Sequence, residues 1–230
     1  ELRLEDLNLS TQKTFETKFS EAEDRLDPEY YQSKYKKIIS KLKSQKSKLL
    51  GEIVKIKKGI EVGHEAYTNE GMPFIRVQDF DEKELIVSGN TNCIRPYLYE
   101  ELKKNHKPNA GEIIFSKDGT VGRAFVIRKD NNEFIVSGGI LILTSRDIDN
   151  YYLAFVLNSL AVKSQTVRES IGAIIQHLSV EEVKNLKIPI LSQSLQQKIS
   201  SLIQQSFKLR QEAKELIKEA KTKVEKLIEE

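Results

Sequence analysis

The sequence predicts an α+β fold, in which a globular mixed-sheet domain is followed by a long C-terminal coiled-coil helix. All eleven glycines lie between Gly51 and Gly172, and neither glycine nor proline interrupts residues 29–50 or 190–230. Because glycine and proline mark turns, a turn-rich middle is bracketed by two helical segments. The 230 residues are 39% hydrophobic, with nine phenylalanines and eight tyrosines, which is enough bulk for a packed interior.

The chain begins with a polar, mixed stretch over residues 1–26, which we interpret as a lead-in or linker. A helix is predicted next, over residues 29–50, because Asp27 can cap it and Pro28 suits the first helical position. Its apolar side chains follow at helical spacing: Tyr31, Tyr35, Ile38, Ile39, Leu42 and Leu49.

The middle of the chain alternates short apolar runs with turn residues, which is typical of strands. The predicted strands are residues 53–57, 74–77, 84–87, 112–115, 121–127, 134–136 and 140–144. A helix is predicted over residues 150–168, and a shorter one after Ser179, whose spacing to Glu182 matches a capping box. Residues 187–190 form a last extended piece, so the predicted globular domain covers residues 27–190.

Residues 191–230 carry the clearest pattern, which predicts a coiled-coil helix for spacing and dimerisation. Ser194 and Gln197 match another capping box. Apolar side chains then recur in alternating steps of four and three, and we call them the heptad seam: Leu195, Ile199, Leu202, Leu209, Ala213, Leu216, Ala220 and Leu227. We expect the helix of residues 29–50 to cover part of this seam and a second partner to cover the far end.

Positive charge is concentrated in one part of the chain. Residues 34–58 hold ten lysines and a single acid, Glu52, whereas the whole chain has a net charge of only +3. A run of this kind is typical of a surface that faces phosphate, but it also fits a merely solvated helix face.

Several classes of chemistry lack a motif, so no catalytic residue, cofactor or metal site is predicted. The sequence has no phosphate-binding loop and no dinucleotide-binding glycine pattern, and Gly119 and Gly122 indicate only a tight turn. The single cysteine, Cys93, and the three histidines match no disulfide or zinc pattern, which favours a cytoplasmic setting. Three nuclease-like E-x-K matches fall on predicted helices and indicate surface charge: Glu182 with Lys184, Glu212 with Lys214, and Glu219 with Lys221. No apolar run is long enough for a membrane span. The chain is therefore predicted to be a binding protein.

Weak motifs occur in a distinctive order along the chain. They are residues 25–31 (RLDPEYY), 56–60 (IKKGI), 71–76 (GMPFIR), 111–116 (GEIIFS) with Gly119 and Gly122, 151–157, 178–186, 187–189 and 196–199. This order, ending in a long helix, resembles a target recognition domain and its helical region in specificity (S) subunits of type I restriction-modification systems. The resemblance covers roughly residues 25–230. Two departures are Glu112, where the family usually has Asp, and Leu191, which replaces a common proline.

The resemblance implies a non-catalytic subunit that determines where DNA is methylated and cut. A full S subunit has two recognition domains and two helical regions, so this chain corresponds to half a subunit, whether naturally short or part of a longer chain. It implies that the recognition domain reads one half-site of double-stranded DNA and that the helices set the spacing. Methyltransferase (M) and restriction (R) subunits would dock on it, and the chain would form a homodimer or pair with a second half subunit.

Candidate DNA-binding residues divide by the chemistry of their side chains. Cations suited to phosphate are Lys57, Lys58, Lys117, Arg123 and Arg168. Donors and acceptors suited to base edges are His64, Tyr67, Arg76, Gln78, Gln176 and His177. Each also has a plain structural interpretation, and Tyr67 with Arg76 in particular is compatible with simple packing on the sheet surface. Gln176 and His177 are the strongest base readers, because they lie in a loop between Gly172 and the helix capped by Ser179.

Three classes of function stay open at this point. A DNA-specificity subunit is favoured. A coiled-coil scaffold without a DNA function would show no salt-sensitive DNA binding, and a DNA-cleaving enzyme would nick DNA with magnesium. The chain could also belong to a methyltransferase–nuclease fusion, or be another DNA-binding protein outside restriction-modification.

Overall fold

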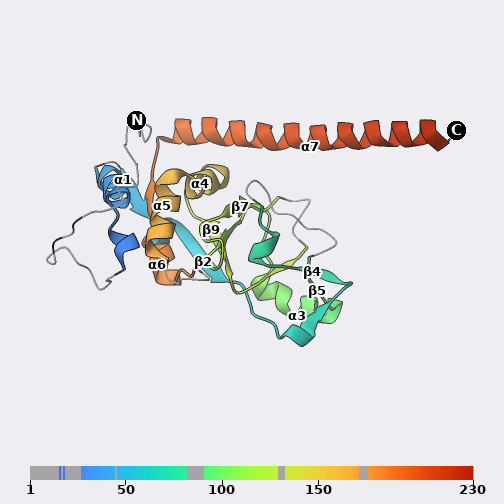
Figure 1. Ribbon diagram of the computed structural model, residues 1–230, viewed down its shortest axis with the longest axis horizontal. Helices are drawn as coiled ribbons and strands as arrows, with labels where there is room; N and C mark the ends of the chain where they lie inside the picture. Colours follow the sequence, from blue (N-terminus) through green and yellow to red (C-terminus); the bar gives the residue numbers. More distant parts are fainter. Residues whose placement is uncertain are drawn as a thin grey trace. The chain divides into compact units, whose positions relative to one another are not determined.

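The computed structural model describes residues 16, 18, 27–44, 46–81, 91–128, 133–170 and 176–229 (Figure 1). The chain divides into two compact units, Glu1–Ile190 and Leu191–Glu230. The described strands all belong to the first unit, and the second is a single long helix. The predicted α+β class with a long C-terminal helix is therefore confirmed. Most of the expected lead-in over residues 1–26, and all of the expected strand at 84–87, lie outside the described residues.

An antiparallel four-stranded sheet forms the centre of the first unit. Its order is β2 (Val54–Lys58), β9 (Ile140–Ser145), β6 (Ile113–Ser116) and β7 (Ala124–Val126). Strands β6 and β9 are continuous apolar runs, as expected for strands that are covered on both faces. All of β6 and the first four residues of β9 are buried, with Ile114 paired opposite Ile142.

The turn between β6 and β7 depends on two glycines. Gly119 and Gly122 have φ values of +66° and +81°, a region that side chains other than glycine rarely adopt. A Cβ atom on Gly122 would also lie 2.5 Å from the hydroxyl oxygen of Thr166. The turn therefore shortens the strand predicted over residues 121–127, which begins only at Ala124.

The second sheet is smaller and packs against a helix that the sequence analysis missed. Its order is β3 (Tyr67–Thr68), β5 (Cys93–Ile94), β4 (Met72–Ile75) and β8 (Ile135–Val136), with β4 and β8 parallel. Helix α3 (Pro96–His106) covers it, so that Phe74, Ile94, Tyr99 and Ile135 form one buried cluster. Proline in the first turn and basic residues in the last are ordinary helix signals, and they mark α3 in the sequence.

The β4–β8 ladder joins the two cores of the first unit. Phe74 and Ile135 belong to the cluster under α3, whereas their neighbours Ile75 and Val136 belong to a cluster with residues of β6 and β9. Alternate residues of a strand point to opposite faces, so this ladder is buried on both sides. The segments that leave β4 and β8 therefore start from a rigid base.

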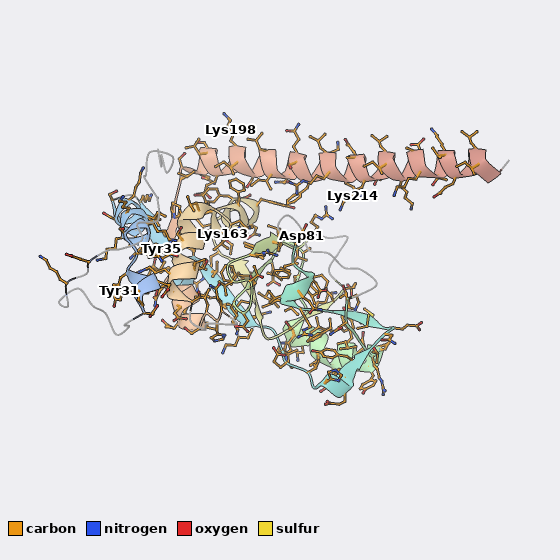
Figure 2. The ribbon with its side chains drawn as sticks, viewed as in Figure 1. Tyr31, Tyr35, Asp81, Lys163, Lys198 and Lys214 are labelled. Carbon is orange, nitrogen blue, oxygen red and sulfur yellow. The ribbon has the colours of Figure 1, made fainter. Side chains whose placement is uncertain are left out.

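The N-terminal helix is shorter than the one predicted over residues 29–50, and that prediction is wrong in its extent. A 3-10 helix, η3 (Pro28–Tyr31), is followed after one extended residue by α1 (Ser33–Lys43). Figure 2 labels Tyr31 and Tyr35, both of which are buried. Helix α5 (Leu160–Glu169) packs against both η3 and α1.

Tertiary pairing explains why the helix ends early. Strand β1 (Ser47–Leu49) pairs with β10 (Lys187–Pro189), and α2 (Leu50–Ile53) packs against α6 (Val180–Lys184). The partners lie far apart in the sequence, as the register of Lys48 with Ile188 shows, so local periodicity could not reveal them. The lysine-rich segment 34–58 is consequently spread over α1, β1 and β2 and is not a single helix face.

The helix predicted over residues 150–168 is divided in two, α4 (Asn150–Leu157) and α5 (Leu160–Glu169). The break lies at Asn158, whose side-chain amide donates to the carbonyl of Ala124 at 2.6 Å. The side chain thus satisfies a backbone acceptor of the sheet, which a continuous helix would not do. The predicted capping box at the start of α6 is confirmed, because the hydroxyl of Ser179 accepts from the amide of Glu182 at 3.1 Å.

Helix α7 (Gln193–Glu229) forms the second unit. Its 37 residues span about 55 Å at 1.5 Å per residue. The predicted cap at Ser194 is displaced, because the helix already includes Ser194 and the amide of Gln196 donates to the carbonyl of Ser192. In the described part of the chain, no helix combines the length and the apolarity that crossing a membrane requires.

Candidate nucleic-acid interface

The segment after β4 is a braced turn that presents two of the predicted base readers. Arg76 follows the strand, and Gln78 lies at the middle of the 3-10 helix η5 (Val77–Asp79); both side chains are exposed. The Asp79 carboxylate accepts from the amide of Arg76 at 2.8 Å and from the hydroxyl of Thr91 at 3.2 Å. Burial raises the pKa of Asp79 above its usual value, despite these hydrogen bonds.

A second segment is held by pairing between distant parts of the chain. The amide of Gly119 donates to the carbonyl of Gln176, and the amide of Leu178 donates to the carbonyl of Lys117, each at 2.8 Å. These two bonds form a short antiparallel bridge beyond the end of β6. The structure thereby brings three predicted residues, Lys117, Gln176 and His177, to one place.

Asp118 connects the side chains of this bridge. One carboxylate oxygen contacts Nδ1 of His177, and the other accepts from the ammonium of Lys117 at 2.7 Å. The Lys117 side chain is only 12% exposed, whereas that of His177 is 49% exposed. The lysine is therefore largely occupied within the protein, while the imidazole faces solvent.

The braced turn and the bridge border one hollow, which we call the cleft. Its volume is about 250 Å³, and its lining residues are Glu61, Arg76, Val77, Gln78, Asp118, Gly119, Ser137 and Gly139. Two predicted base readers, Arg76 and Gln78, line it directly. Gln176 and His177 adjoin it through their contacts with Gly119 and Asp118.

Tyr67 and His64 lie next to Arg76. The guanidinium carbon of Arg76 is 5.9 Å from the centre of the Tyr67 ring, and the rings of His64 and Tyr67 are 5.9 Å apart, edge to face. Tyr67 also contacts the buried Phe74, with ring centres 5.7 Å apart. Tyr67 is therefore a packed support for Arg76, and His64, exposed in η4 (His64–Ala66), forms the outer edge of this group.

Lys57 and Lys58 are exposed at the end of β2. The chain continues from them along the first sheet, with the amide of Gly59 donating to the carbonyl of Ile140 at 2.9 Å. Ile60 then bridges to Ser137, which lines the cleft. Both lysines thus precede the cleft by only a few residues.

Two of the predicted phosphate contacts lie apart from the cleft and bond to the protein itself. The guanidinium of Arg123 donates to the carbonyl of Phe80. Arg168 stacks 3.7 Å from the centre of the Tyr30 ring, donates to the Tyr30 carbonyl at 3.2 Å, and pairs with Glu169 at 2.9 Å. These contacts tie α5 to η3 and favour a structural role for Arg168.

Sequence reasoning missed three polar residues of the cleft: Glu61, Asp118 and Ser137. Acids are not typical of a surface that faces phosphate, although carboxylates orient neighbouring donors. The position of Asp118 between a candidate lysine and a turn glycine is the available signal. Nothing local indicates that it contacts His177, which is 59 residues further along.

The described residues show no group of three or more His, Cys, Asp or Glu side chains arranged to hold a metal ion. The first E-x-K match has local roles instead. Glu182 accepts from the amide of Ser179, and Lys184 pairs with Glu181 at 3.1 Å. Glu182 therefore caps helix α6, and Lys184 takes part in a surface ion pair.

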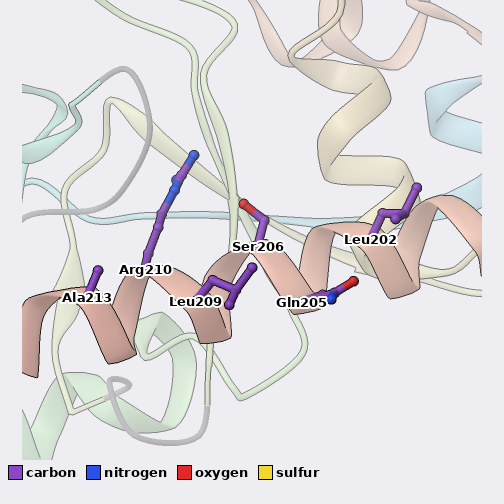
Figure 3. A pocket seen from close by; sticks show the side chains of 6 residues that line it. All are labelled: Leu202, Gln205, Ser206, Leu209, Arg210 and Ala213. Atoms are coloured by element: carbon purple, nitrogen blue, oxygen red, sulfur yellow. The ribbon is translucent and has the colours of Figure 1, made fainter. Parts of the chain in front are cut away.

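The heptad seam lies on α7 and is largely exposed. Leu202, Leu209, Leu216 and Leu227 are 59%, 56%, 65% and 74% exposed. Figure 3 shows the stretch from Leu202 to Ala213, where Gln205, Ser206 and Arg210 accompany the seam. An apolar stripe of this kind favours a helical partner.

Comparisons with known proteins give one family. The family model of the type I restriction modification DNA specificity domain matches residues 42–222. No curated protein matches the sequence.

Three solved structures are similar to this chain at low sequence identity. The S subunit of a type I restriction-modification system from M. genitalium has a TM-score of 0.48 and 19% identity, over 68% of this chain and 37% of that one. A chain from a structure on assembly and conformational transition of the type I system has a TM-score of 0.52 and 18% identity, over 79% and 43%. The type IIG restriction endonuclease BpuSI has a TM-score of 0.52 and 11% identity, over 74% and 27%. The chain thus spans less than half the length of each.

Proposed function

Because the chain belongs to the family of type I restriction-modification DNA specificity domains, we propose that it reads one half-site of double-stranded DNA. The first unit is the reading part, and the cleft with its borders is the reading surface. The observation that carries the proposal is the family match over residues 42–222, which includes every residue of the cleft.

The chemistry of the cleft suits base edges. Guanidinium, amide and imidazole groups supply the donors and acceptors that distinguish bases in the major groove. Arg76, Gln78, Gln176 and His177 offer these groups from two braced segments. Rigid presentation is favourable, because little conformational entropy is lost when DNA binds.

We assign contact with the DNA phosphates, which does not depend on base sequence, to exposed lysine side chains. Lys57 and Lys58 are exposed beside the cleft and suit the phosphate backbone. Arg123 and Arg168 contribute chiefly through the protein contacts described above, and Lys117 through its contact with Asp118.

The remaining features concern assembly. The exposed seam of α7 serves as spacer and dimerisation helix, either in a homodimer or with a second half subunit. M and R subunits dock on the complex and supply DNA methylation and cleavage, so that the chain itself is non-catalytic. The proposed location is the cytoplasm, which the single cysteine favours.

Randomised-site enrichment followed by fluorescence anisotropy tests the proposal. Wild-type protein should select one DNA sequence and bind it about a thousandfold more tightly than shuffled DNA. Arg76→Ala with Gln78→Ala should lose most of this preference. The matched control on α7, Arg210→Ala with Gln211→Ala, removes a guanidinium and an amide from the second unit and should keep this preference. Failure to enrich any sequence contradicts the proposal.

A second candidate is the recognition part of a fused methyltransferase–nuclease. The likeness to the type IIG restriction endonuclease BpuSI, at the same TM-score of 0.52 as the type I chain, is the observation that raises it. The two candidates predict the same DNA binding but a different arrangement of the methyltransferase reading frame relative to this chain. A methyltransferase reading frame continuous with this chain would establish the fusion, whereas a separate adjacent frame would establish the type I subunit. In both cases the isolated chain should neither methylate nor cut DNA.

A further inference from the structure

The side chains of Asp118 and His177 face each other across a short antiparallel bridge. The bonds from Gly119 to Gln176 and from Leu178 to Lys117 flank this pair. In antiparallel pairing, residues flanked in this way form the non-hydrogen-bonded pair, whose side chains approach most closely. The backbone pairing therefore places the side chains of Asp118 and His177 opposite each other.

The Asp118 carboxylate is held on several sides. Its second oxygen accepts from the Lys117 ammonium at 2.7 Å, and the amide of Lys117 donates to the carbonyl of Gly139 at 2.9 Å. A Cβ atom on Gly139 would lie 3.3 Å from this second carboxylate oxygen of Asp118 and 3.3 Å from a methyl of Val77. The absence of a side chain at 139 therefore leaves the space that the carboxylate occupies.

This contact determines which imidazole nitrogen carries a proton. An ionised carboxylate only accepts hydrogen bonds, so the neutral imidazole places its proton on Nδ1, next to Asp118. The other nitrogen, Nε2, is then an unprotonated acceptor. The side chain of His177 is half exposed, so this acceptor is available at the edge of the cleft.

We propose that Asp118 is a positioning residue for base reading, which holds His177 in the tautomer that accepts at Nε2. The proposal rests on the proposed function and adds the kind of base that this position reads. In the major groove the donors are the exocyclic amino groups of adenine and cytosine. His177 therefore selects a base that carries an amino group, and Lys117 acts by holding Asp118.

The first experiment observes the free protein and needs no DNA. Nitrogen-15 spectra of the neutral form of the His177 imidazole should show protonated Nδ1 in the wild type. In Asp118→Asn the amide oxygen should face the donor-only Lys117 ammonium, so that the amide NH2 faces Nδ1 of His177. Asp118→Asn and Asp118→Ala should therefore both shift the population toward protonated Nε2. An unchanged tautomer in Asp118→Ala overturns the proposal. Circular dichroism establishes that each variant is folded.

The second experiment uses a double-mutant cycle on the enriched DNA site. Asp118→Ala and His177→Ala should each lower the preference for the selected site about tenfold, and the double variant should lose no more than either single variant. The difference in affinity between the wild type and these variants should disappear on a DNA site in which the base with the contacted amino group is replaced. Glu100→Ala removes an acid from another lysine pair and should leave the preference unchanged.

The outcomes separate this inference from the proposed function. Independent, additive losses from Asp118→Ala and His177→Ala overturn the positioning role while DNA reading stands. A wild-type chain that prefers no DNA site overturns the proposed function and the base-reading role of His177 with it. The tautomer measurement then still decides whether Asp118 orients the imidazole.

Discussion

The first unit and α7 use apolar side chains in opposite ways. In the first unit, Ile114 and Ile142 on the central strands are completely buried. On α7, Leu209 is 56% and Leu227 is 74% exposed, although both belong to a regular seam. The difference teaches that one unit completes its own core, whereas the other carries an apolar surface suited to a partner.

The strongest test of this difference compares one core residue with one seam residue. Ile142→Ala should lower the free energy of unfolding of the first unit by about 2–5 kcal/mol, because it leaves a cavity between fully packed strands. Leu209→Ala should lower the free energy of unfolding only to the extent that α7 is stabilised by self-association. Urea denaturation at two protein concentrations measures both, and equal, concentration-independent losses would show that the seam is already buried within the chain.

The molecular mass in solution tests whether the heptad seam mediates self-association. We expect the wild type to self-associate at tens of micromolar, and Leu209→Lys with Leu216→Lys to be monomeric by light scattering, because charge in a seam opposes burial. Gln204→Lys with Gln211→Lys places the same charges at outer positions of the same heptads and should remain associated. A monomeric wild type contradicts the prediction of a homodimer and leaves pairing with a different half subunit to be tested by mixing.

Base reading should belong to the first unit and should depend on Gln176. Its side-chain amide can form two hydrogen bonds with an adenine edge, which are worth roughly 1–3 kcal/mol against a wrong base. Gln176→Ala should therefore reduce discrimination while leaving binding to random DNA nearly unchanged. Competition titrations with selected and shuffled duplexes measure this, and a proportional loss of both would make Gln176 a backbone contact.

Phosphate contact should differ from base reading in its salt dependence. Lys57→Ala with Lys58→Ala should weaken selected and random DNA alike, because phosphates carry no sequence information. The slope of log affinity against log salt should become shallower by about one to two units. Anisotropy at four salt concentrations is sufficient, and an unchanged slope would remove these lysines from the interface.

The smallest expected effect concerns the braced turn at Asp79. Burial raises the pKa of this carboxyl from 3.8, so the folded state favours its protonated form. The stabilisation from Asp79 is therefore complete below pH 3.8 and is lost as the pH rises through the raised value. Relative to Asp79→Asn, the wild type should lose stability over that interval in urea denaturation. A constant difference between the two proteins contradicts the assignment.

Local patterns predicted most regular elements of this protein, but not the ends that depend on distant partners. The apolar runs of β6 and β9 and the capping box at Ser179 are complete within a few residues, and each was identified correctly. The helix predicted over residues 29–50 was too long because pairing with β10 overrides helical spacing. Helix α3 was missed although its proline and basic end are visible in the sequence.

The candidate site shows the same division. Composition indicated which side chains can bind DNA, and those at Arg76, Gln78, Gln176 and His177 lie on or beside one cleft. Composition did not indicate Asp118, whose contact with His177 joins segments 59 residues apart. A local pattern carries no information about such a pairing.

The mixed α+β class, the heptad seam of the last helix, the Ser179 cap and the chemistry of the candidate side chains could all be predicted from local sequence. Each depends on spacing within a few residues or on residue type. Three features depend on contacts between distant segments: the end of α1, the position of the β4–β8 ladder between two cores, and the contacts of Asp118 with Lys117 and His177. The physical reason is that backbone pairing and burial between distant segments compete with local preference, and their strength depends on partners that only folding brings together.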